Sequence, residues 1–132
     1  MQEIITTTRK PDVTFYRNGR IDISAGVARS LHLSAGDVIS IACEDADSPP
    51  DRREWYLHVR PRESLLGRHE GTVFAAKKGY GSFRTHSRCM ARTIFELCRA
   101  TGQSRLRLSV GEPVINARSE TLLPIIYKNI LP

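Results

Sequence analysis

The stretch from residue 15 to residue 42, FYRNGRIDISAGVARSLHLSAGDVISIA, most constrains the fold because its local signals all agree with one another. Asn18 and Gly19 form a strong signal for a tight turn between two strands, since both residues accept a positive φ. Alternating apolar residues and then a short helical pattern follow the turn. Gly36 and Asp37 then introduce an apolar strand. The stretch therefore predicts a hairpin, a short helix and a buried strand.

Beyond this stretch the chain is predicted to be mainly strand, with one longer helix over residues 87–100. Met90, Ile94 and Leu97 give that helix an apolar stripe, and Gly102 is placed to end it. The fold class predicted by these short strands and two helices is α+β, mainly β. The expected strands are residues 13–16, 20–24, 38–41, 55–59, 72–76, 82–85, 106–110 and 122–131.

A chain of 132 residues fits one ordinary domain or two very small ones. We expect residues 1–12 to be a flexible lead-in, residues 13–62 to be a hairpin unit, and residues 63–132 to be a basic second half packed on it. Ser24 is expected to cap the short helix with its side chain. Pro124 is expected at an edge or a bulge, because proline cannot donate a hydrogen bond to a neighbouring strand.

The two halves of the chain share a degenerate pattern of residues. Gly-Arg-Ile at residues 19–21 and Gly-Ser-Phe at residues 81–83 each open a short strand. Each strand leads into a helix that contains Ala-Arg, at residues 28–29 and 91–92. An internal duplication would explain the match, with two similar halves pairing in one core as a fused dimer. A chance match is the alternative, since strand, helix and strand in succession are common.

Basic residues are concentrated in the second half of the chain. Residues 1–66 contain nine Lys or Arg and ten Asp or Glu, whereas residues 67–132 contain eleven and four. Residues 77–107 contain eight basic side chains and one acidic side chain, Glu96. Such a concentration favours an anionic partner, most simply nucleic acid. A solvated basic face that maintains solubility is the alternative.

The composition also indicates the compartment. The chain has no apolar run that approaches the length of about 18 residues needed to span a membrane. The N-terminal MQEIITTTRK lacks the apolar core of a secretory signal. The three cysteines are widely spaced and do not suggest a disulfide framework. We therefore expect a reduced, cytoplasmic protein.

The segment NGRIDISAGVARSLHLSAGDVISI resembles the swapped-hairpin, AbrB-like family of bacterial DNA-binding domains. That family has a Gly-Arg-Ile/Val strand, then Ile-Pro, a short helix that ends in Leu-x-Leu, and Gly-Asp before an apolar strand. The resemblance covers about residues 13–42, and residues 13–59 when the next strand is included. The matching positions are Gly19, Arg20, Ile21, Ile23, Leu31, Leu33, Gly36 and Asp37.

The resemblance implies a transition-state regulator or a MazE-type antitoxin, in which two subunits interleave their hairpins and bind DNA. By position, Arg20 and Arg29 match the DNA-contacting arginines of the family, and Arg17 lies beside them. The chain departs from the family at Ser24, where proline is usual, and at Ala28, where DNA binders often have a second arginine. Solvation of the unit is the other role open to these arginines.

The longer helix is predicted to carry three arginines close together on the face opposite its apolar stripe. A basic, glycine-rich loop at residues 77–81 precedes the helix. A mobile basic loop beside a row of arginines could follow a phosphate backbone. Such contacts would give affinity and salt dependence without reading bases. The predicted nucleic-acid-binding residues of this half are Lys77, Lys78, Arg84, Arg88, Arg92 and Arg99.

The sequence contains no convincing catalytic set. His86 and Cys89 could share one helical turn, but a zinc site needs further ligands. Cys98 is better suited to packing in the core. His69 and Glu70 could form an acid–base pair, although such residues more often lie in a solvated loop. We therefore expect neither enzyme activity nor a metal or other cofactor.

These observations predict a cytoplasmic regulatory protein that binds double-stranded DNA, as a homodimer or a fused pseudo-dimer, with no attachment to a membrane. One alternative is an assembly or protein-interaction module whose apolar tail, residues 122–131, docks on a partner. The other is a small enzyme or a ligand-binding barrel with a deep pocket.

Overall fold

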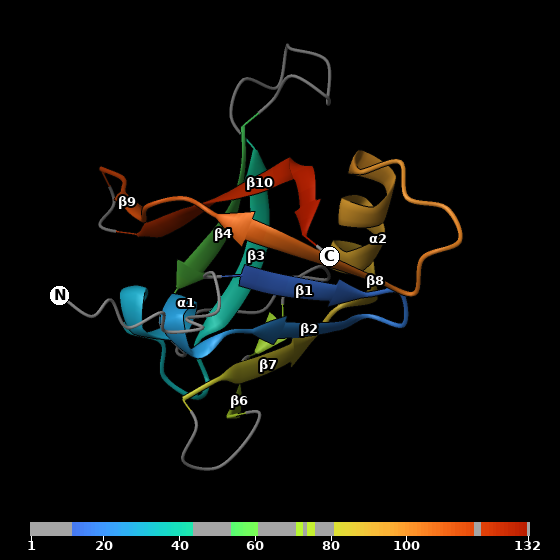
Figure 1. Cartoon of the computed structure of the whole chain (residues 1–132). Helices are drawn as coiled ribbons and strands as arrows, with labels where there is room; N and C mark the ends of the chain where they lie inside the picture. The colour runs from blue at the N-terminus through green and yellow to red at the C-terminus, as the bar shows by residue number, and fades with distance from the viewer. Residues whose placement is uncertain are drawn as a thin grey trace, which may run out of the picture.

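The computed structural model describes residues 12–43, 54–60, 71–72, 74–75, 81–117 and 120–131, and Figure 1 shows how they are arranged. The fold is mainly β with short helices, which confirms the predicted α+β class. The helices are α1 (Ala25–Ser30) and α2 (Arg88–Leu97). The strands are β1 (Asp12–Tyr16), β2 (Arg20–Ile23), β3 (Val38–Cys43), β4 (Trp55–Arg60), β5 (Gly71–Thr72), β6 (Phe74–Ala75), β7 (Phe83–His86), β8 (Arg105–Val110), β9 (Val114–Ile115) and β10 (Thr121–Leu131).

The described strands form one curled antiparallel sheet. Their order is β5-β3-β4-β10-β8-β1-β2-β7-β6, and β9 pairs with β10 outside this order. The strands at the two ends of the order, β5 and β6, are separated in the chain by Val73 alone. The sheet therefore curls until its two ends lie next to each other in the chain (Figure 1).

Strands are exchanged between the two halves of the chain. β1 pairs with β2, its hairpin partner, and also with β8 from the second half. In the same way β6 pairs with β7, and β5 pairs with β3 from the first half. Each half therefore places its first strand beside a strand of the other half, and neither half completes the sheet alone.

The two halves meet at two places, and the pairing is symmetric at both. Between β2 and β7, Asp22 lies opposite Arg84. Between β4 and β10, Leu57 lies opposite Leu123. Exchanging the two halves about these two pairs matches β1 with β5 and β6, β2 with β7, β3 with β8, and β4 with β10, and this exchange preserves the pairings among the strands. The strand arrangement of one half therefore repeats in the other.

The core lies inside the curled sheet. Alternate residues of the strands point inward, as the period of two requires, and α2 adds Met90 and Ile94 from one side. These inward side chains are almost completely buried, so the exposed side chains of the same strands lie on the outer face. The most deeply buried apolar residues of the strands are Val13, Phe15, Ile21, Ile23, Val38, Ile39, Leu57, Leu106, Leu108 and Leu123.

Ser24 precedes α1 in the capping position, but its side chain makes no capping hydrogen bond. Its hydroxyl instead accepts a hydrogen bond from the backbone N–H of Asp12 at 3.2 Å. The predicted side-chain cap is therefore wrong, because the hydroxyl connects the start of the helix to β1. Neither α1 nor α2, the helices of the described residues, is long and apolar enough to cross a membrane.

The predicted strand at residues 122–131 forms as β10. Pro124 lies at neither of its two expected places, an edge or a bulge, since the register of β10 with β8 shifts between Ile126 and Ile130. β10 lies between β4 and β8, and Pro124 is opposite Tyr56. The carbonyl of Pro124 accepts a hydrogen bond from the N–H of Gly111 at 2.9 Å. The nitrogen of Pro124, which carries no hydrogen, therefore faces the turn between β8 and β9. At this position β10 needs no hydrogen bond to a neighbouring strand. Leu123, Ile125 and Tyr127 are buried, so this part of β10 contributes to the core.

Candidate nucleic-acid interface

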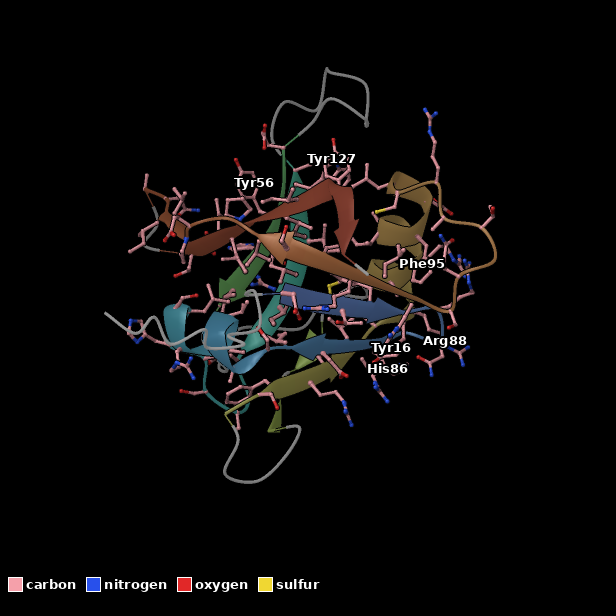
Figure 2. All side chains as sticks on the ribbon, viewed as in Figure 1. Tyr16, Tyr56, His86, Arg88, Phe95 and Tyr127 are labelled. Carbon is pink, nitrogen blue, oxygen red and sulfur yellow. The ribbon has the colours of Figure 1, made fainter. Side chains whose placement is uncertain are left out.

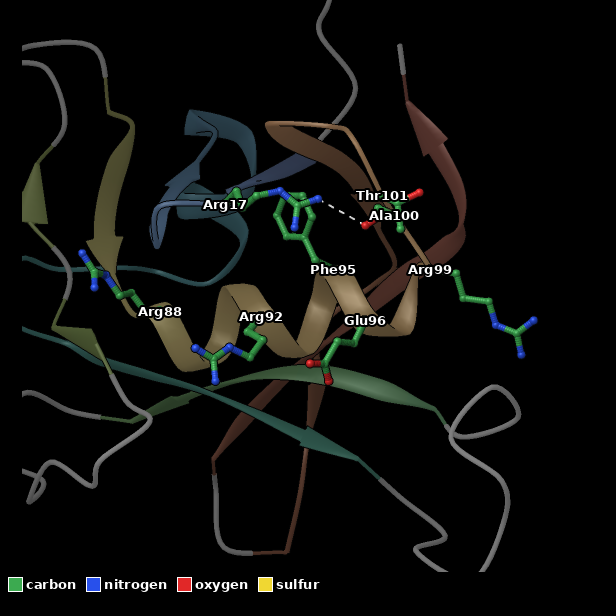
Figure 3. A pocket seen from close by; sticks show the side chains of 8 residues that line it. All are labelled: Arg17, Arg88, Arg92, Phe95, Glu96, Arg99, Ala100 and Thr101. Carbon is green, nitrogen blue, oxygen red and sulfur yellow. Dashed lines mark hydrogen bonds between the residues drawn. The ribbon is translucent and has the colours of Figure 1, made fainter.

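Arg17, in the turn between β1 and β2, is held in place by residues that follow α2. Its Nε donates to the carbonyl of Gln103 at 2.8 Å, and its Nη2 donates to the carbonyl of Ala100 at 3.2 Å. Its guanidinium also lies over the ring of Phe95, 4.3 Å from the ring centroid (Figure 3). Three contacts therefore fix the orientation of Arg17, which reduces the entropy lost when it binds a ligand.

The fixed Arg17 lines a pocket of about 460 Å³ that extends along α2, from its first residue to the turn after its C-terminal end, and we call it the helix-end pocket. Arg88 and Arg92 lie on successive turns of the helix, and Arg99 extends from its far end (Figure 3). These three side chains form no salt bridge with any residue that the structure describes. The pocket therefore contains guanidinium groups that are available to an anion.

The predicted helix over residues 87–100 is too long at its C-terminus. α2 ends at Leu97, and Arg99 reverses the chain with φ of 52°. The N–H groups of Arg99 and Ala100 donate to the carbonyls of Glu96 and Phe95, both at 3.0 Å, which is a Schellman arrangement. Arg99 therefore takes the left-handed position at the end of the helix, which we predicted for Gly102. Because Arg99 lies outside the helix, helical periodicity does not determine the direction of its side chain.

Arg99→Gly is expected to raise the free energy of unfolding by about 0.5 kcal/mol, because glycine adopts positive φ without a steric penalty. Urea unfolding followed by circular dichroism measures this change. Arg99→Lys retains both the positive charge and the strained backbone, so its stability should match that of the wild type. A destabilised Arg99→Gly variant would contradict the expectation and indicate a stabilising role for the arginine side chain.

The electrostatic balance of the helix-end pocket favours an anion. Arg17, Arg88, Arg92 and Arg99 contribute four positive charges. Glu96 contributes one negative charge, and the C-terminus of a helix contributes about half of one. The helix end is also partly neutralised, since its last carbonyls accept hydrogen bonds. A clear excess of positive charge therefore remains.

A second hollow lies on the outer face of the sheet over β8, β1, β2 and β7, and we call it the sheet-face hollow. Its volume is about 680 Å³. Tyr16 lines this hollow while Arg17, the next residue, lines the helix-end pocket, so the two hollows meet at the β1–β2 turn. Figure 2 shows Tyr16, His86 and Arg88 at this end of the molecule. The arginines that line the sheet-face hollow are Arg84, Arg105 and Arg107.

Two of the predicted binding residues share an acidic partner on this face. Asp22 accepts a hydrogen bond from Nη2 of Arg20 at 3.0 Å and from Nε of Arg84 at 2.7 Å. Asp12, which is fully buried, accepts from Nε of Arg107 at 2.8 Å. The arginines of the sheet-face hollow are thus largely paired within the protein, in contrast to those of the helix-end pocket.

Of the remaining predicted residues, Arg29 lies apart from these two hollows. Arg29 and His32 line a separate pocket of about 440 Å³ beside α1. His32 follows α1 with φ of 51°, as Arg99 follows α2, so the two helices end in the same way. Lys77 and Lys78, in the predicted basic loop, lie outside the described residues.

Arg17, Arg105 and Arg107 belong to the candidate interface but were not among the residues predicted to bind. The alternation of β8 indicates that Arg105 and Arg107 lie on an exposed face, which is a usable signal. Arg17 had only its position before the Asn-Gly turn as a signal. Its contacts are with residues more than 80 positions away in the chain, and these are not visible in the sequence.

Metal binding and thiol chemistry were the other possibilities that the sequence raised. No group of three or more His, Cys, Asp and Glu side chains in this part of the chain is arranged to hold a metal ion. Burial raises the pKa of the Cys98 thiol to about 11, so this thiol stays protonated at neutral pH. Its Sγ donates to the carbonyl of Tyr127 at 3.5 Å, which is a packing role. His69 and Glu70 lie outside the described residues.

Comparisons with known proteins give no further assignment. The chain matches no protein-family model, no curated protein and no solved structure.

Proposed function

We propose that this protein is a regulator that binds double-stranded DNA, and that the two halves of one chain act as the two subunits of a swapped-hairpin dimer. The exchange of β1 and β5 between the halves supports this interpretation. So does the AbrB-like pattern of residues 13–42. Because the strand pairings are completed within the chain, the binding unit is a monomer.

The observation that carries the proposal is the helix-end pocket. It combines one immobilised guanidinium, Arg17, with three arginines that have no acidic partner among the described residues. Arginine binds phosphates through a planar fork of donors. Phosphate groups along a nucleic-acid backbone present a continuous row of acceptors for such side chains. An extended polyanion fits this surface better than a single small anion, since the sheet-face hollow adjoins it at the β1–β2 turn.

The proposal predicts that the chain binds a fluorescein-labelled duplex of about 25 base pairs, with an affinity that falls steeply from about 50 to 300 mM KCl. Arg88→Gln combined with Arg92→Gln should weaken binding at least about 10-fold at ~100 mM salt. The same change should reduce the slope of log K against log salt by about 1.8, since each lost phosphate contact contributes about 0.9. Fluorescence anisotropy measures both quantities.

A matched control separates a local site from a general effect of charge. Arg92→Gln combined with Glu112→Gln keeps the formal net charge of +6, and Glu112 lies in the exposed turn after β8. This double variant should lose as much affinity as Arg92→Gln alone. An absence of binding at the lowest salt concentration, or recovery of affinity in the charge-matched variant, would refute the proposal.

A further inference from the structure

Asp22 lies at the centre of the candidate interface, between two arginines that belong to different halves of the chain. One carboxylate oxygen accepts from Nε of Arg84 at 2.7 Å, and the other accepts from Nη2 of Arg20 at 3.0 Å. The Asp22 side chain is 26% exposed, and the side chains of Arg20 and Arg84 are 38% and 34% exposed. Water therefore reaches the group, and an ion pair that is this exposed can be broken at little cost.

The arrangement has the geometry of a phosphate site that is occupied by a carboxylate. A phosphodiester also presents two oxygens that share one negative charge, and these can accept from two guanidinium groups at the same distances. The Nε of Arg20 is buried and has no hydrogen-bond partner among the described residues. The guanidinium of Arg20 lies over the ring of Tyr16, 4.0 Å from its centroid, which fixes the orientation of Arg20.

The surroundings of Asp22 favour an anion rather than a cation. The residues opposite it on the neighbouring strands are Thr14 and Arg84, and Thr14 in turn lies opposite Arg107. Arg105 lines the same hollow without a salt bridge to any described residue. Removing the charge of Asp22 would leave this part of the sheet-face hollow with several arginines, and only Arg107 would keep a described acidic partner, Asp12.

Asp22 and its two arginines lie on the path that a nucleic-acid backbone would follow across the interface. β2 and β7 are antiparallel, and each leads directly into a helix. α1 and α2 therefore lie at opposite ends of the β2–β7 pair (Figure 1). Asp22 and Arg84 lie between the pocket beside α1, with Arg29, and the helix-end pocket, with Arg92.

We propose that the sheet-face hollow is a second site for a backbone phosphate, and that Asp22 occupies it in the free protein as an internal competitor. This inference rests on the proposed binding of DNA. Asp22 thereby limits the affinity of the surface, because a phosphate must displace it from Arg20 and Arg84.

Asp22→Asn keeps the shape of the side chain and removes its charge. It should strengthen binding to the labelled duplex about 5-fold at ~100 mM salt. It should also steepen the slope of log K against log salt by about 0.9, which corresponds to one added phosphate contact. Glu112→Gln changes the net charge equally at a remote turn and should alter the affinity less than about 2-fold.

Arg84→Gln provides the decisive comparison. In the wild type this substitution should change DNA affinity less than about 2-fold, because Arg84 is already paired with Asp22. In the Asp22→Asn background it should abolish the whole gain in affinity. Equal losses in the two backgrounds, or no gain from Asp22→Asn while the wild type binds, would overturn the proposal.

Inorganic phosphate provides a readout that does not depend on DNA. The Nε–H resonance of Arg84, followed by NMR, should shift when phosphate is added to Asp22→Asn and should remain unchanged in the wild type at the same concentration. A shift that is equal in the two proteins, or absent in both, would contradict the inference. If the wild type fails to bind DNA, the proposed function is wrong, and this titration still decides whether Asp22 occupies a phosphate site.

Discussion

Leu123→Ala is expected to lower the free energy of unfolding by about 3 kcal/mol, which is typical of a leucine truncated in a well-packed core. Leu123 is fully buried, and it lies opposite Leu57, which is also fully buried, where the two halves meet. The cavity would thus form between β4 and β10. Urea unfolding followed by both tryptophan fluorescence and circular dichroism measures the change. Ile115→Ala, at a side chain that is 70% exposed, should cost no more than about 0.5 kcal/mol.

The same variant tests whether the two halves fold together. Because strands are exchanged between the halves, Leu123→Ala should shift one cooperative transition that both probes report at the same denaturant concentration. Leu57→Ala should shift the same transition. The double variant should lose less than the sum of the two single losses, since the two side chains are direct cross-strand neighbours. Two separate transitions, or a Leu123→Ala effect under about 1 kcal/mol, would show that the halves are independent.

Gly19→Ala is expected to destabilise the fold by about 2 kcal/mol and to weaken DNA binding as well. Gly19 has φ of +106°, and an added Cβ would lie 2.8 Å from Cε1 of His86 and 2.9 Å from Cγ of Arg88. Its carbonyl also accepts a hydrogen bond from the N–H of Ser87 at 2.8 Å. The substitution therefore strains the hairpin turn and forces the side chains of His86 and Arg88 to move, and Arg88 belongs to the helix-end pocket.

Gly102→Ala is the matched control for Gly19→Ala. Gly102 also has a positive φ, +84°, but an added Cβ would meet no atom within 4 Å. Its cost should be limited to the backbone strain of about 1 kcal/mol. Both variants are compared by chemical denaturation and by fluorescence anisotropy with the labelled duplex. The comparison separates the cost of backbone strain at positive φ from the cost of the contact between the added Cβ and its neighbours. Equal losses of stability and unchanged DNA affinity in both would contradict the role given to Gly19.

The local elements of this fold are largely predictable from the sequence. The hairpin between β1 and β2 and the alternation of β8 both rest on interactions between near neighbours, and both are confirmed. Within the hairpin turn, however, only Gly19 has a positive φ, whereas the prediction relied on a positive φ at both Asn18 and Gly19. The end of α2 is not predictable in this way. Glycine is the residue expected in the left-handed conformation that ends a helix. The prediction therefore placed the end of α2 at Gly102, whereas Arg99 occupies that position.

The candidate interface is less predictable, because its charges are distributed by pairings between distant segments. A run of basic residues does not reveal that Asp22 lies opposite Arg84, or that Asp12 accepts a hydrogen bond from Arg107. These pairings divide the arginines into those that are neutralised and those, such as Arg92, that have no described acidic partner. Strand register thus determines which guanidinium groups are available, and register depends on the complete sheet.

The late position of β8 has a consequence for how the chain reaches this arrangement in a cell. Asp12 of β1 and Arg107 of β8 are 95 residues apart, and such long-range pairing slows folding. At ribosomal rates of about 5–20 residues per second, the first hairpin leaves the ribosome on the order of 10 s before its partner strand is synthesised. During that interval the apolar side chains of Val13 and Phe15 lack their final neighbours. The hairpin therefore completes its packing only after most of the chain has been synthesised.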